Sequence, residues 1–293
     1  AALMRILRSF FTERGFLEVD TPIRQPVLLP ERYIEPLSSD GAYLQTSPEI
    51  CMKRLLSKGC SKIFQICPCF RKNESGRRHL EEFTMLEWYH SDQNYLTLMN
   101  DCEELLRFLS RYLALANTSG TVHNIFAGYD LEAPWERLTV ESAFTKYGPC
   151  SVHQALKEDR FDEVLVENVE PNLGRKRPTF LLDYPKELGS LARTKPDNPD
   201  IVERFELYLG GLELANGFTE LTDEIEQRCR FTEEINEISD MWQRDVEMPE
   251  RFLEDLRDLH SAAGIALGVD RLFMLAFGLK DIADAVSFSP ADL

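Results

Sequence analysis

The chain has 293 residues with 33 Lys or Arg and 50 Asp or Glu, so its formal net charge at pH 7 is −17. With 43% hydrophobic and 28% charged residues, it has the composition of a folded globular protein, and its length provides a core that needs no disulfide or metal. The negative charge argues against a surface that binds nucleic acid throughout, because such binding depends on Lys and Arg displacing counterions. A local basic patch remains compatible with it.

The apolar segments are short and the cysteines are scattered. The apolar run at 272–279 is far below the roughly 20 residues that span a bilayer, so no membrane helix is expected. Seven cysteines, an odd number, favour a reducing cytoplasm over a disulfide framework. Cys60, Cys67 and Cys69 are close in sequence but lack a fourth ligand and CxxC spacing, so a place in the core is favoured over a metal site. The histidines form no HExxH pattern, which gives no support to a zinc hydrolase.

Four helices are expected in chain order. Residues 1–11 carry apolar side chains at helical spacing, interrupted by Arg5 and Arg8, which predicts a surface helix and not a signal peptide. The Ser-Pro-Glu triplet at 47–49 predicts a second helix that Ser caps and Pro opens, with an apolar stripe at positions 52, 55 and 56. Further helices are expected over 96–113 and 272–277.

Two pairs of β-prone segments predict two hairpins. Residues 62–71 and 83–90 are joined by the polar loop 72–82, and residues 203–209 are joined to 212–221 by a Gly-Gly turn. Antiparallel hairpins among helices make the fold class α+β, and 1–293 is interpreted as one domain. No segment carries a strand-linked GxGxxG or a GxxxxGK[ST] loop, so a parallel nucleotide-binding sheet is not supported.

The β segment at 83–90 and the loop before it contain candidate catalytic or ligand-binding residues. Alternation along 83–89 places Glu87 and Tyr89 on one face and Leu86 and Trp88 on the other; alone, this also fits an edge strand with a solvated face. The loop 71–79 concentrates four basic residues and a histidine. Guanidinium groups there can clamp phosphate, and the alternative is a solvated charged loop.

Two later segments add carboxylates and glycines. Glu213 and Glu220 are seven residues apart, so they face opposite ways on an unbroken strand. A bulge or a strand-to-helix change at Asn216-Gly217 would bring both to one side, as two Mg²⁺ ligands beside a triphosphate require. In the 264–271 segment, glycines allow close approach to a flat ligand, and Arg271 in the first turn of the following helix suits a phosphate.

In chain order these segments resemble the three signature motifs of class II aminoacyl-tRNA synthetases. Residues 10–22 resemble motif 1, the helix and strand of the dimer interface; residues 70–89 resemble motif 2, and residues 264–271 resemble motif 3. The resemblance covers nearly the whole chain, and three motifs in order are far more specific than one. It implies a class II catalytic core, an antiparallel sheet flanked by helices, and a homodimer formed through motif 1.

Within the class, the chain is most similar to the lysine group. The similarity lies in the sequence Glu-Leu-Ala-Asn-Gly-Phe at 213–218, in Glu220, and in His79, which precedes residues 82–85. Two features are similar to the truncated paralogues that attach (R)-β-lysine to a lysine of elongation factor P. No room exists for the N-terminal barrel that reads the anticodon, and Ala266 replaces a glycine of motif 3. The family links this extra methyl to a preference for β-lysine over α-lysine, and a one-methyl difference is worth roughly 1 to 3 kcal/mol in a tight pocket.

The resemblance also implies roles for individual residues. The amino-acid substrate would be contacted by Ser47, Pro48, Glu49, Tyr89, Glu220 and Ala266. ATP would be bound by Arg71, Lys72, Asn73, Glu213, Leu214, Gly268 and Arg271. Mg²⁺ would be held by Glu213 and Glu220, and catalysis would rest on Arg71, Arg271, Glu213 and Glu220. The family commonly has Arg-Asn-Glu at the start of motif 2, where this chain has Arg-Lys-Asn-Glu at 71–74.

These expectations describe a cytoplasmic, ATP-dependent ligase that works in two steps. The substrate carboxylate attacks the α-phosphorus of ATP to form an acyl-adenylate, and a lysine ε-amine of elongation factor P then attacks the adenylate. No base for the second step is identified. The candidate docking patches are 71–79 and 174–177. One alternative is a truncated lysyl-tRNA synthetase that charges tRNA, which the net charge disfavours; the other is a non-catalytic paralogue that binds an amino acid or a partner.

Overall fold

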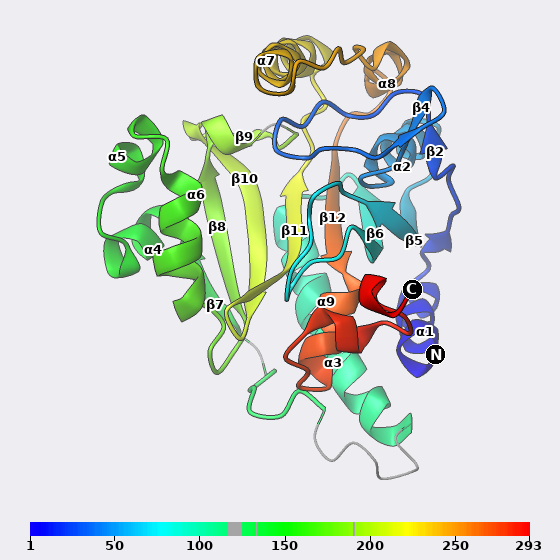
Figure 1. The fold of residues 1–293 in the computed structure, drawn as a ribbon, viewed down its shortest axis with the longest axis vertical. Helices are drawn as coiled ribbons and strands as arrows, with labels where there is room; N and C mark the ends of the chain where they lie inside the picture. The colour runs from blue at the N-terminus through cyan, green and yellow to red at the C-terminus, as the bar shows by residue number, and fades with distance from the viewer. Residues whose placement is uncertain (117–124, 133, 190) are drawn as a thin grey trace.

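The computed structural model describes residues 1–116, 125–132, 134–189 and 191–293. Across these residues the centre of the fold is a nine-stranded sheet in the order β1-β5-β6-β12-β11-β10-β8-β7, with β9 paired to β10 (Figure 1). Both predicted hairpins are present: β5 (Lys62–Phe70) pairs with β6 (Glu82–Ser91), and β10 (Asn198–Leu209) pairs with β11 (Leu212–Thr219). The last strand, β12 (Ala262–Gly268), pairs with both β6 and β11 and so joins the two hairpins.

The α+β class is confirmed, and the sheet is mixed because its two edges are parallel. At one edge β1 (Leu17–Glu18) runs parallel to β5; at the other, β7 (Glu136–Thr139) runs parallel to β8 (Thr179–Pro185). Both edge strands are short and are followed by helical crossovers, which parallel pairing requires. Strand β9 covers Thr194–Lys195, and a small separate sheet contains β2 (Arg24–Gln25), β3 (Ser38–Ser39) and β4 (Ala42–Leu44).

All four predicted helices form. The α-helices are α1 (Ala2–Glu13), α2 (Glu49–Ser57), α3 (Tyr95–Ala116), α4 (Val140–Tyr147), α5 (Val152–Lys157), α6 (Phe161–Val164), α7 (Glu224–Trp242), α8 (Glu250–Leu256) and α9 (Val269–Ala276). Over the described ranges, none of the helices combines the length and the apolar character needed to cross a membrane. The expected cap of α2 is displaced by one residue: Pro48 occupies the cap position, and the Ser47 hydroxyl accepts a 3.4 Å hydrogen bond from the Glu49 N–H.

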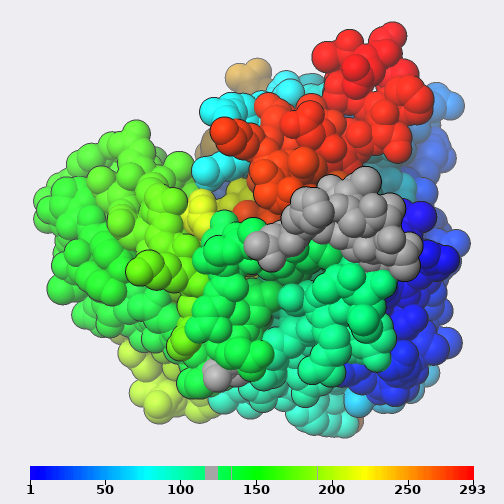
Figure 2. Space-filling view, turned by 90° about the horizontal axis from the view of Figure 1, so that it is seen from below, coloured from blue at the N-terminus to red at the C-terminus, as the bar shows by residue number. Residues whose placement is uncertain are grey.

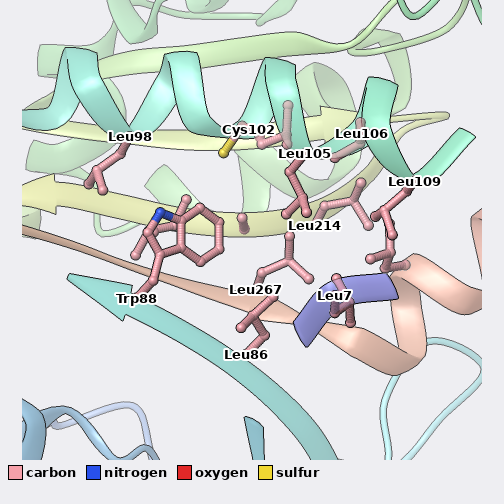
Figure 3. Close-up of a cluster of buried hydrophobic side chains, with 14 of the residues drawn as sticks. Leu7, Leu86, Trp88, Leu98, Cys102, Leu105, Leu106, Leu109, Leu214 and Leu267 are labelled. Carbon is pink, nitrogen blue, oxygen red and sulfur yellow. The ribbon is translucent and has the colours of Figure 1, made fainter. Parts of the chain in front are cut away.

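Helix α3 covers one face of the central strands, and this contact forms the main hydrophobic core (Figure 3). Leu86 and Trp88 of β6 are fully buried there, beside Leu267 of β12 and Leu105 of α3. Each such side chain contributes about 1.5–3 kcal/mol by leaving water. The predicted alternation of β6 is therefore confirmed, but the strand lies inside the sheet between β5 and β12 and is not an edge.

Two further clusters border the other face of the sheet. Helices α4 to α6 pack on β8 and β10 through residues such as Phe144, Phe161 and Tyr184, and form a lobe on one side of the molecule (Figure 2, green). Helices α2, α7 and α8 pack together through Met52, Phe231 and Phe252. The face of β6, β12 and β11 opposite α3 therefore lies between these two groups.

The seven cysteines are all free. Cys67 and Cys69 are buried in a small cluster with Met85, whereas Cys60 is half-buried. Nowhere in the described ranges do three or more His, Cys, Asp or Glu side chains gather in a way that could hold a metal ion.

Candidate functional site

A cavity of about 510 Å³ opens on the face of the sheet opposite α3. Its floor contains Met85 of β6, Ala266 of β12, and Asn216 and Phe218 of β11. Its walls come from residues 31–34, from the loop that follows β5, and from the start of α9. Motifs 2 and 3 therefore meet in this cavity, because β12 pairs directly with β6.

A β-bulge decides which side chains of β11 reach the cavity. Glu213 lies opposite Tyr208 and Ala215 lies opposite Leu207, which leaves Leu214 as the extra residue. The bulge is thus at Leu214 and not at Asn216-Gly217, where it was predicted. It reverses the alternation of the strand, so Glu213 shares the cavity face with Asn216 and Phe218.

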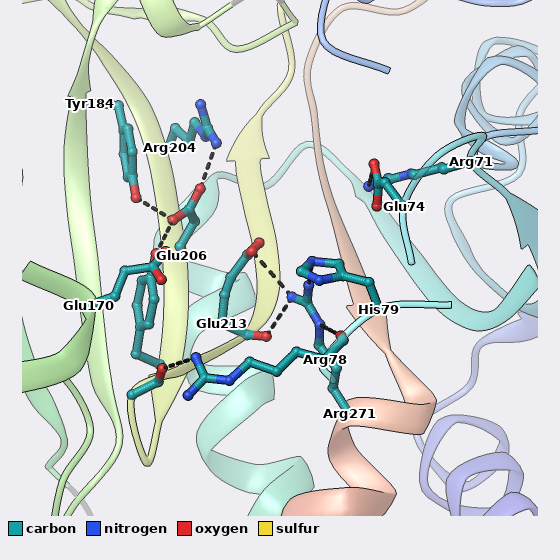
Figure 4. Close-up of polar contacts among 12 residues, drawn as sticks. Arg71, Glu74, Arg78, His79, Glu170, Tyr184, Arg204, Glu206, Glu213 and Arg271 are labelled. Atoms are coloured by element: carbon teal, nitrogen blue, oxygen red, sulfur yellow. Dashed lines mark hydrogen bonds and ion pairs between the residues drawn. The ribbon is translucent and has the colours of Figure 1, made fainter. Parts of the chain in front are cut away.

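Arg78, His79 and Arg271 gather at one end of the cavity, and Arg71 lies apart from them beside Glu74 (Figure 4). Arg271 Nη1 donates to the Glu213 carbonyl oxygen at 2.9 Å and lies 3.3 Å from Glu213 Oε2, and its Nη2 lies 2.5 Å from His79 Nε2. Burial, together with Arg271, lowers the pKa of His79, so the neutral imidazole can accept this hydrogen bond. Arg78 donates to the Gly211 carbonyl at 3.2 Å, and Arg71 lies 3.9 Å from Glu74 Oε1. This cationic end of the cavity has the donors that phosphate oxygens require.

A buried charged cluster lies beside the cavity floor. Lys53 Nζ is 2.5 Å from both Glu49 Oε1 and Glu220 Oε2, and the Lys53 side chain is 1% exposed. Burial raises the pKa of Glu220 to about 8, against the attraction of Lys53 and with the repulsion of Glu49. On β6, the Tyr89 hydroxyl donates to Glu87 Oε2 at 2.8 Å, and burial raises the pKa of Glu87 well above its ordinary value. Lys53 was not identified from the sequence; its i,i+4 spacing from Glu49 was the available signal.

Strand β10 adds a network that the sequence reasoning missed (Figure 4). Arg204 pairs with Glu206 at 2.6 Å, and Glu206 also accepts hydrogen bonds from the Tyr184 and Tyr208 hydroxyls. The Arg204 Nε donates to Asn216 Oδ1 at 3.0 Å. Because this bond occupies the Asn216 carbonyl oxygen, the asparagine has its NH₂ group left to serve as a donor at the cavity floor. The alternating Arg-x-Glu-x-Tyr pattern at 204–208 was a usable signal.

The predicted site residues fall into three groups. Those that line the cavity are Arg71, Glu213, Leu214, Ala266, Gly268 and Arg271. Those in or next to the buried cluster, outside the cavity lining, are Ser47, Pro48, Glu49, Tyr89 and Glu220. The remaining two, Lys72 and Asn73, both contact the Glu35 carboxylate, at 2.5 and 2.8 Å.

Glu213 and Glu220 lie on one face of β11 but not at one site. Seven strand residues span roughly 20 Å, so the two carboxylates cannot coordinate the same ion. Glu220 is completely buried and paired with Lys53, whereas Glu213 is 34% exposed at the cationic end of the cavity. Glu213 is suited to bind a metal ion that also binds phosphate, because Mg²⁺ takes few protein carboxylates and completes its shell with water and phosphate oxygens.

Comparison with known proteins agrees with this geometry. Residues 1–292 match the family model described as tRNA synthetases class II (D, K and N). The chain is 36% identical over 305 residues to the elongation factor P (R)-β-lysine ligase of Salmonella gallinarum, covering 99% of this chain and 93% of that protein. It is 37% identical over 303 residues to the protein of the same name from Proteus mirabilis, covering 98% and 93%. A third such protein, from Pectobacterium atrosepticum, is 36% identical over 322 residues, covering 99% and 93%.

Proposed function

Because the chain belongs to the class II tRNA synthetase family of the D, K and N type, we infer that it is an ATP-dependent ligase for (R)-β-lysine and elongation factor P. It activates (R)-β-lysine as an aminoacyl-adenylate and joins it to the ε-amine of a lysine on that factor. The observation that carries this inference is the match, over 98–99% of this chain, to relatives named for the reaction. The cavity supports it, with cationic groups at one end and buried carboxylates beside the floor.

In the first step the substrate carboxylate, ionised at neutral pH, attacks the α-phosphorus of ATP. Arg71 offsets the charge that builds on the α-phosphoryl oxygens, and Arg271 binds the pyrophosphate that leaves. Glu213 accepts from Arg271, and the neutral His79 lies against the same guanidinium. These contacts hold Arg271 in place before ATP binds, so little reorganisation is needed during the reaction.

Glu213 would hold the Mg²⁺ that accompanies ATP. When bound, the ion neutralises charge on the phosphate oxygens that Arg71 and Arg271 also contact. Glu220 is assigned instead to the amino-acid end, where its pairing with Lys53 keeps the carboxylate at a defined position.

The amino-acid end has more buried carboxylates than cations. Glu49 and Glu220 pair with the ammonium group of Lys53, and Glu87 is close enough to interact electrostatically with Lys53 and Glu49. A substrate with two ammonium groups would relieve this imbalance, since an uncompensated buried charge is costly. Asn216, held by Arg204, is placed to donate to the substrate carboxylate at the floor.

The proposed function also implies a second copy of the chain and a protein acceptor as partners. We expect a cytoplasmic homodimer formed through α1 and β1, where Leu17 is 57% exposed. We expect elongation factor P, and not tRNA, to accept the amino acid, with the exposed residues around 174–177 among the candidate contacts. The turn at 174 receives a backbone hydrogen bond from Gly210 and lies next to Gly211, to which Arg78 of the cavity donates.

Two assays test the function. ATP–pyrophosphate exchange is measured with (R)-β-lysine and with α-lysine, and transfer is measured with purified elongation factor P and with tRNA. We expect faster exchange with (R)-β-lysine and labelling of elongation factor P only. Exchange with neither amino acid would remove the ligase assignment, and charging of tRNA without labelling of the protein would identify a truncated synthetase.

A further inference from the structure

The carboxylate of Glu31 lies at the cavity, and no role has been assigned to it. It lies in the 26–36 segment, which runs beneath α7 in Figure 1 (blue) and contributes residues 31–34 to the cavity wall. Among the residues that the structure describes, none makes a hydrogen bond or an ion pair with this carboxylate. Its oxygens are therefore available to a group that enters the cavity.

The backbone around Glu31 is firmly held although its carboxylate is not. The Arg32 N–H donates to Glu234 Oε2 at 2.9 Å, and the Arg32 carbonyl accepts from the Trp242 indole N–H at 3.0 Å. Arg32 also forms an ion pair with Glu237. These contacts fix the segment on α7, so the Glu31 side chain starts from a defined place on the cavity wall.

The surroundings of Glu31 contain both signs of charge. Glu49 and Lys53 face it from α2, Arg71 from the end of β5, and Glu234 from α7. Burial raises the pKa of Glu31 to about 7, with Glu49 and Glu234 raising it further and Arg71 and Lys53 lowering it. Near neutral pH this carboxylate can therefore both accept and release a proton.

The transfer step needs such a group, if the proposed function holds. The acceptor ε-ammonium has a reference pKa near 10.4, so less than about 0.1% of it is free amine at pH 7. Only the free amine has the lone pair that attacks the adenylate. Tyr33 of the same segment also lines the cavity and is 56% exposed, so this segment borders the opening of the cavity to solvent.

We propose that Glu31 is the general base of the transfer step. Its carboxylate takes one proton from the acceptor ε-ammonium and becomes a carboxylic acid. The amine nitrogen then bonds to the acyl carbon of the adenylate, and the bond between that carbon and the phosphate oxygen breaks. AMP leaves with the bonding electron pair, the nitrogen releases its second proton to water, and an amide remains. Glu31 returns its proton to water after the product leaves.

The test separates the two steps by comparing Glu31→Gln with the wild type. ATP–pyrophosphate exchange reports adenylate formation, and single-turnover transfer from preformed adenylate to elongation factor P reports the second step. We expect exchange within about threefold of the wild type and transfer slower by about 10²-fold or more, the usual contribution of a general base. Glu233→Gln is the matched control, because Glu233 is an exposed carboxylate on α7 that does not line the cavity, and both of its rates should be unchanged.

The pH profile provides a readout that loss of structure alone would not give. Wild-type transfer should rise with pH through about pH 7, where the base is half ionised, and level off above about pH 8, where the base is almost fully ionised and the acceptor is still an ammonium. In Glu31→Gln the rate should continue to rise tenfold per pH unit above pH 7, because only free amine reacts. Hydroxylamine, which is unprotonated at neutral pH, should trap the adenylate equally fast in both proteins.

Several outcomes would overturn the proposal. These are transfer by Glu31→Gln at the wild-type rate, an equal loss in exchange and transfer, or an equal loss of hydroxylamine trapping. If Glu31→Gln does not fold, the pH profile of wild-type transfer decides. A transfer rate that keeps rising tenfold per pH unit up to pH 9 would exclude Glu31 as the base. Absence of exchange in the wild type would instead remove the proposed function, so the two failures are distinguishable.

Discussion

Lys53 of α2 and Glu220 at the end of β11 form an ion pair of 2.5 Å with side-chain exposures of 1% and 0%. Lys53 also pairs with Glu49 at 2.5 Å, so one ammonium group joins a helix to the central sheet beside the cavity floor. A buried pair of this kind adds little net stability compared with apolar residues, but removal of one partner leaves an uncompensated charge.

Replacement of Lys53 by Met should therefore destabilise the protein strongly. We expect the free energy of unfolding to fall by about 3–5 kcal/mol, because Glu49 and Glu220 remain buried without their cation. Urea unfolding at pH 7 measures this. Lys58→Met is the control: Lys58 is 57% exposed and pairs with Asp255, so its loss should change the unfolding free energy far less than the loss of Lys53. Equal effects of the two substitutions would contradict the structural role assigned to Lys53.

Gly264 of β12 has no space for a side chain. A methyl group there would lie 2.1 Å from Tyr89 Cε1 and 2.5 Å from Glu220 Oε1, and both of these groups are buried. Gly264→Ala should thus lower the unfolding free energy by about 1–3 kcal/mol through overpacking. At Gly268, four residues along, the nearest atom to an added methyl is 3.6 Å away on the Arg271 side chain. Gly268→Ala should accordingly have the unfolding free energy of the wild type. Similar losses of unfolding free energy in both variants would contradict the close packing around Gly264.

Ala266 should influence the choice between β-lysine and α-lysine. Its methyl lines the cavity floor, and its residue pairs with Asn216 on one side and Glu87 on the other. Removing the methyl in Ala266→Gly deepens the floor, so α-lysine activation should improve about 10-fold relative to β-lysine, the usual value of one methyl in a tight pocket. The ratio of kcat/KM values in pyrophosphate exchange tests this. An unchanged ratio would show that selectivity arises elsewhere.

Glu170 should make stability depend on pH. Burial, with repulsion from Glu213 and Glu206, raises its pKa from 4.5 to about 7. The folded protein therefore holds a proton that the unfolded chain releases between about pH 4.5 and 7, and the unfolding free energy falls as pH rises through this window. Glu170→Gln removes this contribution, so its stability relative to the wild type should increase with pH. The difference in unfolding free energy between the two proteins should change by less than about 1.4 kcal/mol per pH unit, because Glu170 is partly exposed. Parallel pH profiles from urea unfolding would refute the assignment.

Local patterns in the chain were enough to predict both hairpins, four of the helices (α1, α2, α3 and α9) and the class II likeness, but not α4 to α8. The alternation of β6 correctly separated Leu86 and Trp88, which enter the core against α3, from Glu87 and Tyr89, which face the other way. Two-residue periodicity and a Gly-Gly turn are properties of neighbouring residues, so they are visible without the fold. The motif order likewise placed Arg71, Glu213 and Arg271, which meet in one cavity.

The remaining features depend on pairing between distant segments. The bulge at Leu214 reflects the register of β11 against β10, and nothing in the β11 sequence alone distinguishes it from a bulge at Asn216. Lys53 acquires its partners only when α2 docks beside β11, and Glu31 becomes a cavity residue only when its segment is held on α7. The amino-acid sequence by itself determined both hairpins, the helices α1, α2, α3 and α9, and the chemical class of the site. The tertiary structure decided which charges are buried, paired or left available, because burial and pairing are set by contacts between segments that are far apart in the chain.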